Sequence, residues 1–572
     1  MTLSTSSPSS ITVTLHQLLA ASSSDDRHSL QQVFTANMTA AVSESSHQIT
    51  AVQLDAVINI PFQQFCLDRR QLASNDVFVL LKSHTPNCQK SRDHLYQAAN
   101  NAAFILSEID PIALLATANV PPHANLELTK TDNAKSIAQQ QLDTLPCPVL
   151  YVPHIRDFLG SLIQACLQYQ QPVTLPTVIA VTGTNGKTTI SQLVAQLTQL
   201  TGMSSAVMGT AGNGRLGALV QASHTTGDAL AVQQFLYQMG KEGAELLALE
   251  ASSHGLDQQR LQGMPVSVAI YTNLSRDHLD YHADMAEYAA AKAKLFDKAH
   301  FPDLTHAIIN IDDEHAQIML DTAHASNLTV WTYSLDSLKT ATFVAANITP
   351  SLQGVEISLR TDFDDGTMNH LDIVSPLLGR FNVANLLAAI AAAVGLGISL
   401  ESIATVIPQL QGAVGRMQRV PSNDGCFIVD YAHTPDALSQ VLASLKTHCK
   451  GQLWAVFGCG GDRDAGKRPL MAQAGLAGAD KVVLTADNPR TEDPNAILQD
   501  MQAGMSTEQY QRTHIEPARQ AAIEYAVNQA AADDIVVIAG KGHETYQEIN
   551  HVRYDFDDSV ILQNALKQAG RV

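Results

Sequence analysis

Short apolar runs, separated by polar and helix-periodic stretches, divide the chain into three α/β parts. In the first part, runs at 77–81 and 148–152 flank a helical pattern near 93–107, and this order predicts a small N-terminal α/β domain. The first 50 residues are polar, which predicts a partly mobile segment, although 11–21 suits a short helix or strand.

The central part alternates most clearly between strand-like and helical patterns. Apolar runs at 246–249, 266–271 and 307–310 are separated by helical stretches, and an Ala- and Leu-rich helix at 382–394 precedes glycine stop signals. Such alternation predicts a mostly parallel sheet covered by helices, of the phosphate-loop type.

The last part repeats this pattern with four strand-like runs and intervening helices, at 427–430, 453–457, 481–485 and 534–539. They predict a doubly wound, Rossmann-like domain whose ligands meet the C-terminal ends of its strands. A Pro-containing linker at 170–176 and a break near 410 divide the chain into predicted domains 1–170, 171–410 and 411–572.

Composition narrows the functional classes. The 572 residues carry a net charge of −20, which argues against a nucleic-acid-binding surface. No apolar run approaches the roughly 18 residues of a membrane span. Seven scattered cysteines without a Cys-x-x-Cys pair suggest neither a disulfide framework nor a zinc site. We expect a cytoplasmic monomer that binds no nucleic acid and does not insert into a membrane.

A Gly-rich turn after the apolar run 178–181 is the strongest functional motif. Gly183-Thr184-Asn185-Gly186-Lys187-Thr188-Thr189 has the order strand, phosphate loop, helix. Glycines let backbone N–H groups approach phosphate oxygens, Lys187 reaches the terminal phosphates, and the Thr188 hydroxyl suits a magnesium ion. Val181 stands where the Walker pattern has its first glycine, so the alternative is a tight turn with a surface lysine.

Polar residues with possible chemistry also follow the other central strands. Glu250 comes directly after 246–249, where a carboxylate binds magnesium or orients water, or else makes a capping or salt-bridge contact. His278 lies in a segment dense in Asp, Arg and His, although a lone histidine is more often structural. Lys292 lies in an alanine-rich helix, where lysines ordinarily face solvent.

The C-terminal strands are followed by further polar segments. Arg490 suits bidentate pairing with a carboxylate and Glu544 suits an ammonium group, so together they can grip an amino acid, while singly each is more often a surface charge. The glycines at 458, 460 and 461 lack the full dinucleotide fingerprint. We expect all these clusters to converge on one crevice, because they follow strand ends.

The ordered motifs resemble those of the Mur ligase family, ATP-dependent peptide-bond-forming enzymes of bacterial cell-wall precursor synthesis. The resemblance covers about 177–550 and rests on Thr-Gly-Thr-Asn-Gly-Lys-Thr-Thr, His-Thr-Thr-Gly-Asp, Glu-Ala-Ser-Ser-His-Gly-Leu, Asn-Leu-Ser-Arg-Asp-His-Leu-Asp-Tyr-His, Gly-Arg-Phe-Asn-Val-Ala-Asn, Asp-Tyr-Ala-His-Thr-Pro, Asp-Asn-Pro-Arg and Gly-Lys-Gly-His-Glu. It implies that a substrate carboxylate attacks the γ-phosphate of ATP and that an amine then displaces phosphate.

The resemblance also implies roles for individual residues. The catalytic residues it implies are Lys187, Glu250, His278 and Lys292. Those implied to hold Mg²⁺ are Thr188, Glu250, His278 and a carbamylated Lys292. The implied ATP contacts are Gly183, Thr184, Asn185, Gly186, Lys187, Thr188, Thr189, Asn382, Asp430 and His433.

The resemblance is strongest to members that add the third peptide residue, so it implies UDP-N-acetylmuramoyl-L-alanyl-D-glutamate and meso-2,6-diaminopimelate as substrates. The residues that match the nucleotide-sugar peptide site are His224, Thr225, Thr226, Ser252, Gln258 and Arg260. Those that match the diaminopimelate site are Arg416, Asp487, Asn488, Pro489, Arg490, Gly540 and Glu544. Arg490 favours diaminopimelate over L-lysine, because lysine lacks the distal carboxylate.

The N-terminal part departs from the family pattern. The uridine-binding Leu-Asp-Ser-Arg appears here as Leu-Asp-Arg-Arg at 67–70, and the glycine-containing loop that follows it appears as Lys-Ser-His-Thr-Pro at 82–86. The matching uridine positions are Leu67, Arg69, His84, Thr85 and Pro86.

Three alternatives stay open at this point. One is a Mur-type ligase that uses L-lysine. A second is a ligase similar to folylpolyglutamate synthase, which shares the phosphate loop but does not need the residues at 487–490. A third is a nucleotide-binding regulator that has lost catalysis.

Overall fold

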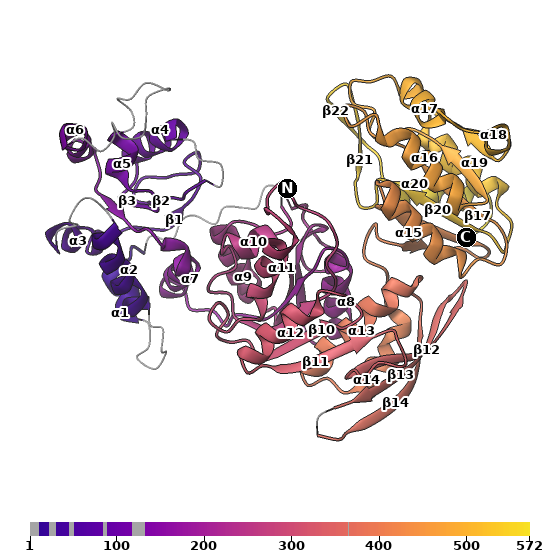
Figure 1. Ribbon diagram of the computed structural model, residues 1–572, viewed down its shortest axis with the longest axis horizontal. Coiled ribbons are helices and arrows are strands. Elements are labelled where there is room, and N and C mark those ends of the chain that lie inside the picture. Colours follow the sequence, from indigo (N-terminus) through magenta and orange to yellow (C-terminus); the bar gives the residue numbers. More distant parts are fainter. Residues whose placement is uncertain are drawn as a thin grey trace.

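Three sheets with their covering helices follow one another along the chain (Figure 1). The computed structural model describes residues 11–21, 30–44, 51–83, 88–116, 132–222, 224–363 and 365–572. In that part of the chain, the N-terminal sheet has four strands, the central sheet ten and the C-terminal sheet six. The predicted α/β class with a mostly parallel central sheet is confirmed.

The N-terminal sheet has the all-parallel order β1-β2-β3-β4. The prediction of a helix near 93–107 is wrong for the C-terminal part of that range. The apolar residues from Phe104 form a strand that is buried between β2 and β4. The first 50 residues, expected to be partly mobile, include two helices. The elements are α1 (Leu15–Ala21), α2 (Leu30–Glu44), α3 (Ala51–Ile58), β1 (Phe65–Cys66), β2 (Val77–Leu80), α4 (Cys88–Ala99), β3 (Phe104–Ser107), α5 (Pro111–Ala116), α6 (Asp132–Asp143), β4 (Val149–Tyr151), η3 (Ile155–Asp157) and α7 (Leu159–Gln170).

The central sheet has the order β14-β13-β12-β11-β10-β9-β5-β8-β6-β7. Helices α8 and α13 pack on one face, where they share a core cluster with the odd-numbered apolar positions of β5. The elements are β5 (Thr177–Thr182), α8 (Lys187–Leu200), β6 (Ser205–Gly209), β7 (Gly212–Gly214), α9 (Ala229–Lys241), β8 (Leu246–Glu250), α10 (Ser253–Asp257), β9 (Val266–Tyr271), α11 (Met285–Ala293), η4 (Lys294–Phe296), β10 (His306–Asn310), α12 (Ala316–Ala325), β11 (Thr329–Ser334), β12 (Phe343–Ser351), β13 (Gly354–Asp362), β14 (Met368–Ser375), α13 (Arg380–Gly395), α14 (Leu400–Val406) and η5 (Ile407–Gln409).

One edge of the central sheet was not predicted from the sequence. Strand β12 pairs in parallel with β11, and β12, β13 and β14 then form an antiparallel meander. Their side chains alternate between buried and exposed along β13, as expected for a sheet with one solvated face.

The C-terminal sheet has the order β15-β16-β20-β17-β18-β19, in which only the β15–β16 pair is antiparallel. All four predicted strands are present, and an additional hairpin is formed by β21 and β22. The elements are β15 (Gln418–Val420), β16 (Cys426–Asp430), α15 (Pro435–Lys446), β17 (Leu453–Phe457), α16 (Lys467–Gly478), β18 (Lys481–Leu484), α17 (Pro494–Gln502), α18 (Thr507–Gln511), β19 (Thr513–Ile515), α19 (Arg519–Gln529), β20 (Ile535–Ala539), β21 (Tyr546–Ile549), β22 (Val552–Asp555) and α20 (Asp558–Gln568).

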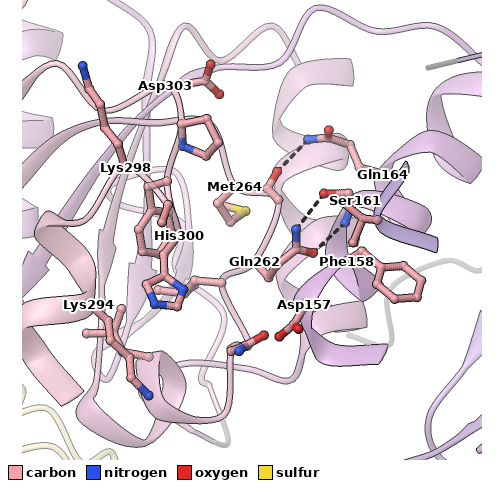
Figure 2. Close-up of a pocket in the computed structure, with 18 of the residues that line it drawn as sticks. Asp157, Phe158, Ser161, Gln164, Gln262, Met264, Lys294, Lys298, His300 and Asp303 are labelled. Atoms are coloured by element: carbon pink, nitrogen blue, oxygen red, sulfur yellow. Dashed lines mark hydrogen bonds between the residues drawn. The ribbon is translucent and has the colours of Figure 1, made fainter. Parts of the chain in front are cut away.

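Helix α7 attaches the N-terminal unit to the central unit. The Ser161 N–H donates to Oε1 of Gln262 at 3.0 Å, and Gln262 Nε2 donates to the Ser161 hydroxyl at 2.8 Å (Figure 2). A Cβ on Gly263, which has φ +77°, would lie 2.6 Å from the Ser161 nitrogen, so the close approach requires glycine. Beside this contact, α7 and the loops at 259–264 and 298–303 line a cavity of about 980 Å³ that does not include the phosphate loop (Figure 2).

His448, just after α15, attaches the C-terminal unit to the central unit. The Gly379 N–H donates to His448 Nε2 at 2.9 Å, and His448 Nδ1 lies 2.8 Å from the Ser351 carbonyl oxygen. Nδ1 must therefore donate while Nε2 accepts, so the ring is neutral. Burial lowers the pKa of His448. Leu352 and Leu378 of the central unit pack into the core of the C-terminal sheet beside this contact.

Candidate active site

The phosphate loop joins β5 to α8 at the carboxyl end of the central sheet. Gly186 precedes α8 with φ 89°, and Gly183 has φ 145°. A Cβ on Gly183 would lie 1.8 Å from the Thr272 hydroxyl oxygen, so only glycine lets the loop pass the end of β9. The free N–H groups of the first turn of α8 are an anion-binding arrangement.

Two lysines bind the same carbonyl oxygen in this loop. Lys187 Nζ donates to the carbonyls of Gly183 and Thr184, both at 2.9 Å, and Lys292 Nζ donates to the carbonyl of Gly183 at 2.9 Å. Lys292 is only 1 % exposed because α11 packs into the core, contrary to the solvent-facing position that helix composition alone favours. Burial, and next the charge of Lys187, lowers the pKa of Lys292 well below its usual value. Burial also lowers the pKa of Lys187, against the opposing effect of Glu250.

Glu250, at the end of β8, lies on the other side of the loop. Its Oε1 accepts from the Thr188 hydroxyl at 2.9 Å and from the Thr210 N–H at 2.8 Å. The Thr210 hydroxyl donates to Oε2 at 3.2 Å. The carboxylate is 2 % exposed and therefore holds the Thr188 hydroxyl in a fixed position. Thr210 lies outside every motif, and its place directly after β6 is the only sequence signal that could have found it.

Oxygen atoms of Thr188 and Glu250 fit a magnesium ion, which prefers hard oxygen ligands and keeps water and phosphate oxygens as its other ligands. The contacts of His278 are with other residues: its Nε2 lies 3.5 Å from Oδ2 of Asp277, and its ring centroid lies 5.9 Å from that of Tyr288. Among the described residues, no three His, Cys, Asp or Glu side chains are grouped so as to hold a metal ion. The protein's own contacts thus bring together two of the four implied metal ligands.

A cluster of rings lines the space next to Lys292, and most of its members were not predicted. The ring centroid of His254 lies 4.1 Å from Tyr281, 5.0 Å from His278 and 5.8 Å from His282, while His282 lies 5.2 Å from Tyr288. Burial, and next the neighbouring histidines, lowers the pKa of His254 to about 4, so this ring is neutral at neutral pH. His282 is buried, and neither of its ring nitrogens has a hydrogen-bond partner in the described part of the chain.

Asn382 and Asn385 lie on α13 beside the phosphate loop. Asn382 Nδ2 donates to the Leu378 carbonyl at 2.8 Å, and Asn385 Nδ2 donates to Oδ1 of Asn382 at 3.1 Å. A Cβ on Gly186 would lie 2.7 Å from Oδ1 of Asn385. Of the two asparagines, Asn385, which is absent from the predicted set, is therefore the one that lies against Gly186 of the loop.

Two other residues predicted to contact ATP lie in the C-terminal unit. The buried Asp430 accepts hydrogen bonds from the N–H groups of Met417 at 2.7 Å and Ala432 at 2.8 Å, and burial raises its pKa. His433 is exposed, with Nδ1 at 2.9 Å from the Tyr431 carbonyl oxygen. Asp430 thus holds the backbone just before β15 and the turn after β16.

The residues implied for the nucleotide-sugar peptide form a chain of hydrogen bonds beside Glu250. The Thr226 hydroxyl donates to the Glu250 carbonyl at 2.8 Å, and the Ser252 N–H donates to that hydroxyl at 3.1 Å. Arg260 donates to the Thr226 carbonyl at 2.9 Å and to Oε1 of Gln258 at 2.8 Å. This part of the implied site is therefore a connected surface.

The segment before Thr226 continues this surface. The Thr225 and Thr210 hydroxyls lie 2.9 Å apart, which connects Thr225 to the Glu250 carboxylate through Thr210. His224 is exposed.

Arg156, absent from the predicted set, links the N-terminal unit to the same surface. Its Nη1 donates to the Gln258 carbonyl at 3.3 Å, its Nη2 to the Lys82 carbonyl at 2.8 Å and its Nε to Oε1 of Glu108 at 2.8 Å. Its position shortly after β4, at a strand end, is the signal that could have found it.

Only part of the implied uridine site lies within the described residues. Leu67 is half-buried, and Arg69 is exposed and donates a hydrogen bond to Gln97. His84, Thr85 and Pro86 lie outside the described residues.

The implied amino-acid pocket is centred on Lys541, the lysine of the Gly-Lys-Gly-His-Glu motif, which is absent from the predicted set of site residues. Lys541 Nζ, which is fully buried, donates to Oδ1 of Asn488 at 3.0 Å and to Asp487 and Glu544, each at 3.4 Å. A Cβ on Gly540 would lie 3.2 Å from Oδ2 of Asp487, so glycine leaves this carboxylate accessible. Two carboxylates, one amide and one ammonium therefore form one network.

Two arginines flank this network. Arg490 follows Pro489 with a positive φ of 51°, and its Nη1 donates to the Gly461 carbonyl at 2.7 Å. Arg416 lies over the ring of Tyr431 at 4.6 Å.

The expected convergence on one crevice stays a prediction, because the contacts of the described residues divide the motifs between two sheets. In the described part of the chain, no hydrogen bond or ion pair joins the network around Lys541 to the phosphate loop, and Figure 1 shows the two sheets as separate bodies. Arg416 is the exception, because its charge contributes to the lowered pKa of Lys187. Convergence at strand ends occurs within each sheet, since the motifs are divided between two sheets.

A phosphate loop in one parallel sheet and a charged pocket in the next define a multidomain, phosphate-binding α/β protein. Residues 181–393 match the Mur ligase middle domain, and residues 415–542 match the family described as Mur ligase, glutamate ligase domain. A protein from Vibrio vulnificus, named UDP-N-acetylmuramoyl-L-alanyl-D-glutamate–2,6-diaminopimelate ligase, is 38 % identical over 510 residues, which cover 89 % of this chain and 95 % of the relative. The chain therefore belongs to the Mur ligase family.

Other comparisons agree with this assignment. A relative of the same name from Pseudomonas aeruginosa is 47 % identical over 399 residues, which cover 70 % of this chain and 79 % of the relative. A solved structure of a protein of that name superimposes with a TM-score of 0.69 at 41 % identity, covering 98 % of this chain and 100 % of the other. Folylpolyglutamate synthase from Mycobacterium tuberculosis, complexed with ADP, shares the fold alone, with a TM-score of 0.53 at 19 % identity over 73 % of this chain and 94 % of the other.

None of the described helices combines the length and the apolar character that crossing a bilayer requires.

Proposed function

We propose that this chain is an ATP- and Mg²⁺-dependent ligase that adds meso-2,6-diaminopimelate to UDP-N-acetylmuramoyl-L-alanyl-D-glutamate in peptidoglycan precursor synthesis. The observation that carries the proposal is the pairing of a cationic phosphate loop in one sheet with a pocket of two carboxylates and an arginine in the next. The names of the relatives at 38 % and 47 % identity support the choice of substrates.

Each unit has a proposed task. The nucleotide-sugar peptide binds to the unit 1–170 and to the surface at Thr226 and Arg260. ATP binds to the unit 171–410, and the amino acid binds to the unit 411–572. Each of these proposed binding residues comes from one chain, so a monomer suffices. We place the reaction in the cytoplasm, because ATP is available there.

In the first step, the free carboxylate of the peptide attacks the γ-phosphorus of ATP, an acyl phosphate forms and ADP leaves. Lys187 and the N–H groups at the start of α8 stabilise the negative charge that develops on the phosphate oxygens. Thr188 and Glu250 would hold a magnesium ion, which would supply Lewis-acid polarisation of the phosphate. Because Lys187 Nζ binds carbonyls in this structure, it must exchange them for phosphate oxygens when ATP enters.

In the second step, the neutral amine of diaminopimelate attacks the acyl carbon, and the tetrahedral intermediate expels inorganic phosphate. Arg490 holds the distal carboxylate, while Asp487 and Glu544 receive the distal ammonium group. Holding the far end in this way orients the attacking amine, which lowers the entropic part of the barrier.

We also propose that Lys292 carries a carbamate in the active enzyme. Its lowered pKa favours the neutral amine, the form that adds to CO₂ with loss of a proton. The resulting anion would replace the repulsion between Lys292 and Lys187 by attraction. This proposal rests on the burial of Lys292 and its short distance to the loop.

Because the two binding sites lie in different sheets, the units must approach each other before the second step. Small-angle scattering should therefore show a more compact particle with ATP analogue, nucleotide-sugar peptide and amino acid together. An unchanged profile with all ligands bound would argue against closure.

A substrate panel tests the reaction itself. Phosphate release from ATP should require both the muramoyl dipeptide and diaminopimelate. Equal activity with L-lysine would contradict the assignment of diaminopimelate as the amino acid. Turnover that depends on a pteridine would favour the alternative of a ligase similar to folylpolyglutamate synthase. ATP binding without turnover on any substrate would favour a regulator.

A further inference from the structure

Lys541 has the most complete set of contacts in the C-terminal pocket, although no motif-based role has been given to it. It follows β20 by two residues and is fully buried. Its Nζ has three protons and three oxygen partners, on Asp487, Asn488 and Glu544. The ring of Tyr546 lies 5.6 Å from Nζ and closes another side.

Lys541 fixes the orientation of the Asn488 amide. Oδ1 of Asn488 accepts from Lys541 Nζ at 3.0 Å and from the Glu548 N–H at 2.9 Å. Nδ2 is therefore turned toward Glu544 Oε2, to which it donates at 3.0 Å. Without the lysine, one of the two donors that hold Oδ1 is lost and the amide is less constrained.

Lys541 also sets the charge of the pocket. Asp487 and Glu544 carry two negative charges and Lys541 one positive charge, so the network retains one negative charge for an incoming ammonium group. The neighbouring Arg519 is already neutralised by Asp558, with bonds of 2.8 and 2.7 Å. Without Lys541, the two carboxylates that now contact the same ammonium group would lack a shared cation, and because like charges disfavour double ionisation they would tend to share a proton.

We propose that Lys541 is a positioning and specificity-determining residue: it keeps Asp487 and Glu544 ionised and Asn488 oriented, so that the pocket selects an amino acid with a distal ammonium group. The inference rests on the proposed function, because it takes the amino acid as the pocket's ligand. Arg490 selects the distal carboxylate independently of this network, since its Nη1 binds the Gly461 carbonyl.

The test uses three amino acids that separate the two distal groups. Diaminopimelate has both groups, 2-aminopimelate lacks the distal amine, and L-lysine lacks the distal carboxylate. Lys541→Met should raise the KM for diaminopimelate by about 30-fold, with a smaller change in kcat and an unchanged KM for ATP. The preference for diaminopimelate over 2-aminopimelate should fall by about tenfold or more.

The pH profile gives a readout that a purely structural role would not change. In Lys541→Met, the KM for diaminopimelate should fall as pH rises from 6 to 8, because the shared proton must leave before the ammonium group binds. Other charged or titratable groups also face the pocket, namely Arg416, Tyr431, Cys459, Arg490, Arg519, His543, Tyr546 and Asp558. They are unchanged in the variant, so the new dependence reports on Asp487 and Glu544.

A double variant and a surface variant complete the experiment. Lys541→Met with Glu544→Gln restores the single negative charge, so the KM should again be flat with pH, and this variant serves if the single one fails to fold. Lys567→Met, on the exposed face of α20, should match the wild type. An unchanged amino-acid preference and a flat pH profile in Lys541→Met would overturn the inference. Failure of the wild type to use diaminopimelate would instead overturn the proposed function.

Discussion

The phosphate loop and the amino-acid pocket both lie at the carboxyl ends of parallel strands, yet they arrange charge in opposite ways. At the loop, Lys187 and Lys292 donate to the same carbonyl oxygen of Gly183 and repel each other. In the pocket, Lys541 binds two carboxylates and an amide oxygen. The loop therefore places two lysines where burial and their proximity disfavour positive charge, whereas the pocket is a nearly balanced network.

This difference indicates two ways of preparing a binding site. Buried positive charge without a counterion lowers stability, and an anionic ligand that neutralises it recovers that free energy on binding. A balanced network gains less from charge neutralisation, but it holds its groups in one geometry and so discriminates between similar ligands. We infer that the loop supplies binding energy for a polyanion and that the pocket supplies selectivity.

The largest expected effect comes from changing the charge at the loop. Lys292→Ala should lower kcat by about 10³-fold, because removal of a charged group at a reacting centre commonly costs this much. If the lysine acts as a carbamate, formate or acetate should restore part of the rate of phosphate release. Lys298→Ala, an exposed lysine in the following loop, is the matched control. Full activity of Lys292→Ala would show that the buried lysine is not needed.

The second largest effect is expected on the selectivity for the amino acid, and only when a residue of the amino-acid pocket is changed. Arg490→Leu should reduce the ratio of kcat/KM for diaminopimelate to that for L-lysine by about 100-fold, because a bidentate partner of the distal carboxylate is lost. The KM for ATP should stay unchanged. A ratio equal to that of the wild type would separate Arg490 from amino-acid choice.

Stability should change in opposite directions when the two buried lysines are each replaced by methionine. Lys292→Met removes an amine that must give up its charge on burial, as its strongly lowered pKa indicates, and the Gly183 carbonyl still accepts from Lys187, so the thermal midpoint should rise by about 2–4 °C. Lys541→Met leaves Asp487 and Glu544 without their cation, and the midpoint should fall by a similar or larger amount. Calorimetry of the ligand-free protein measures both shifts, and shifts of the same sign would contradict the comparison.

The smallest expected effect concerns the contact that His448 makes between the central and the C-terminal unit. Burial lowers the pKa of His448, so the unfolded chain takes up a proton below about pH 6.5 while the folded ring stays neutral. The stability from this group is complete above that pH and is lost as pH falls toward the folded pKa. Between pH 7 and 5, the midpoint of the wild type should therefore fall more steeply than that of His448→Gln, which does not titrate. Parallel curves would show that His448 does not contribute to the dependence.

Much of the fold follows from local patterns in the sequence. The continuous apolar runs at 246–249 and 266–271 form parallel strands that are fully or almost fully buried. The segment at 170–176 lies between helix α7 and strand β5. Errors came where periodicity was ambiguous. The helical pattern near 93–107 includes a short strand, and the meander β12–β14 alternates apolar and polar residues too weakly to stand out.

Motif residues were found more readily than the residues that hold them. Lys187, Glu250 and Arg490 were selected because their chemistry and spacing are distinctive. Thr210 and Arg156 were missed because single threonines and arginines after strands are common, and only their contacts with Glu250 and Gln258 distinguish them.

The sequence by itself determined the strand, loop and helix order of the phosphate loop, the α/β class and the charged motifs at strand ends. These features depend on residue type, spacing and backbone preference, which are local properties. Only the tertiary structure decided that Lys292 is buried beside Lys187, that Lys541 contacts both Asp487 and Glu544, and that the contacts of the motif residues are divided between two sheets. The physical reason is that burial and electrostatic coupling depend on distances between residues far apart in the chain.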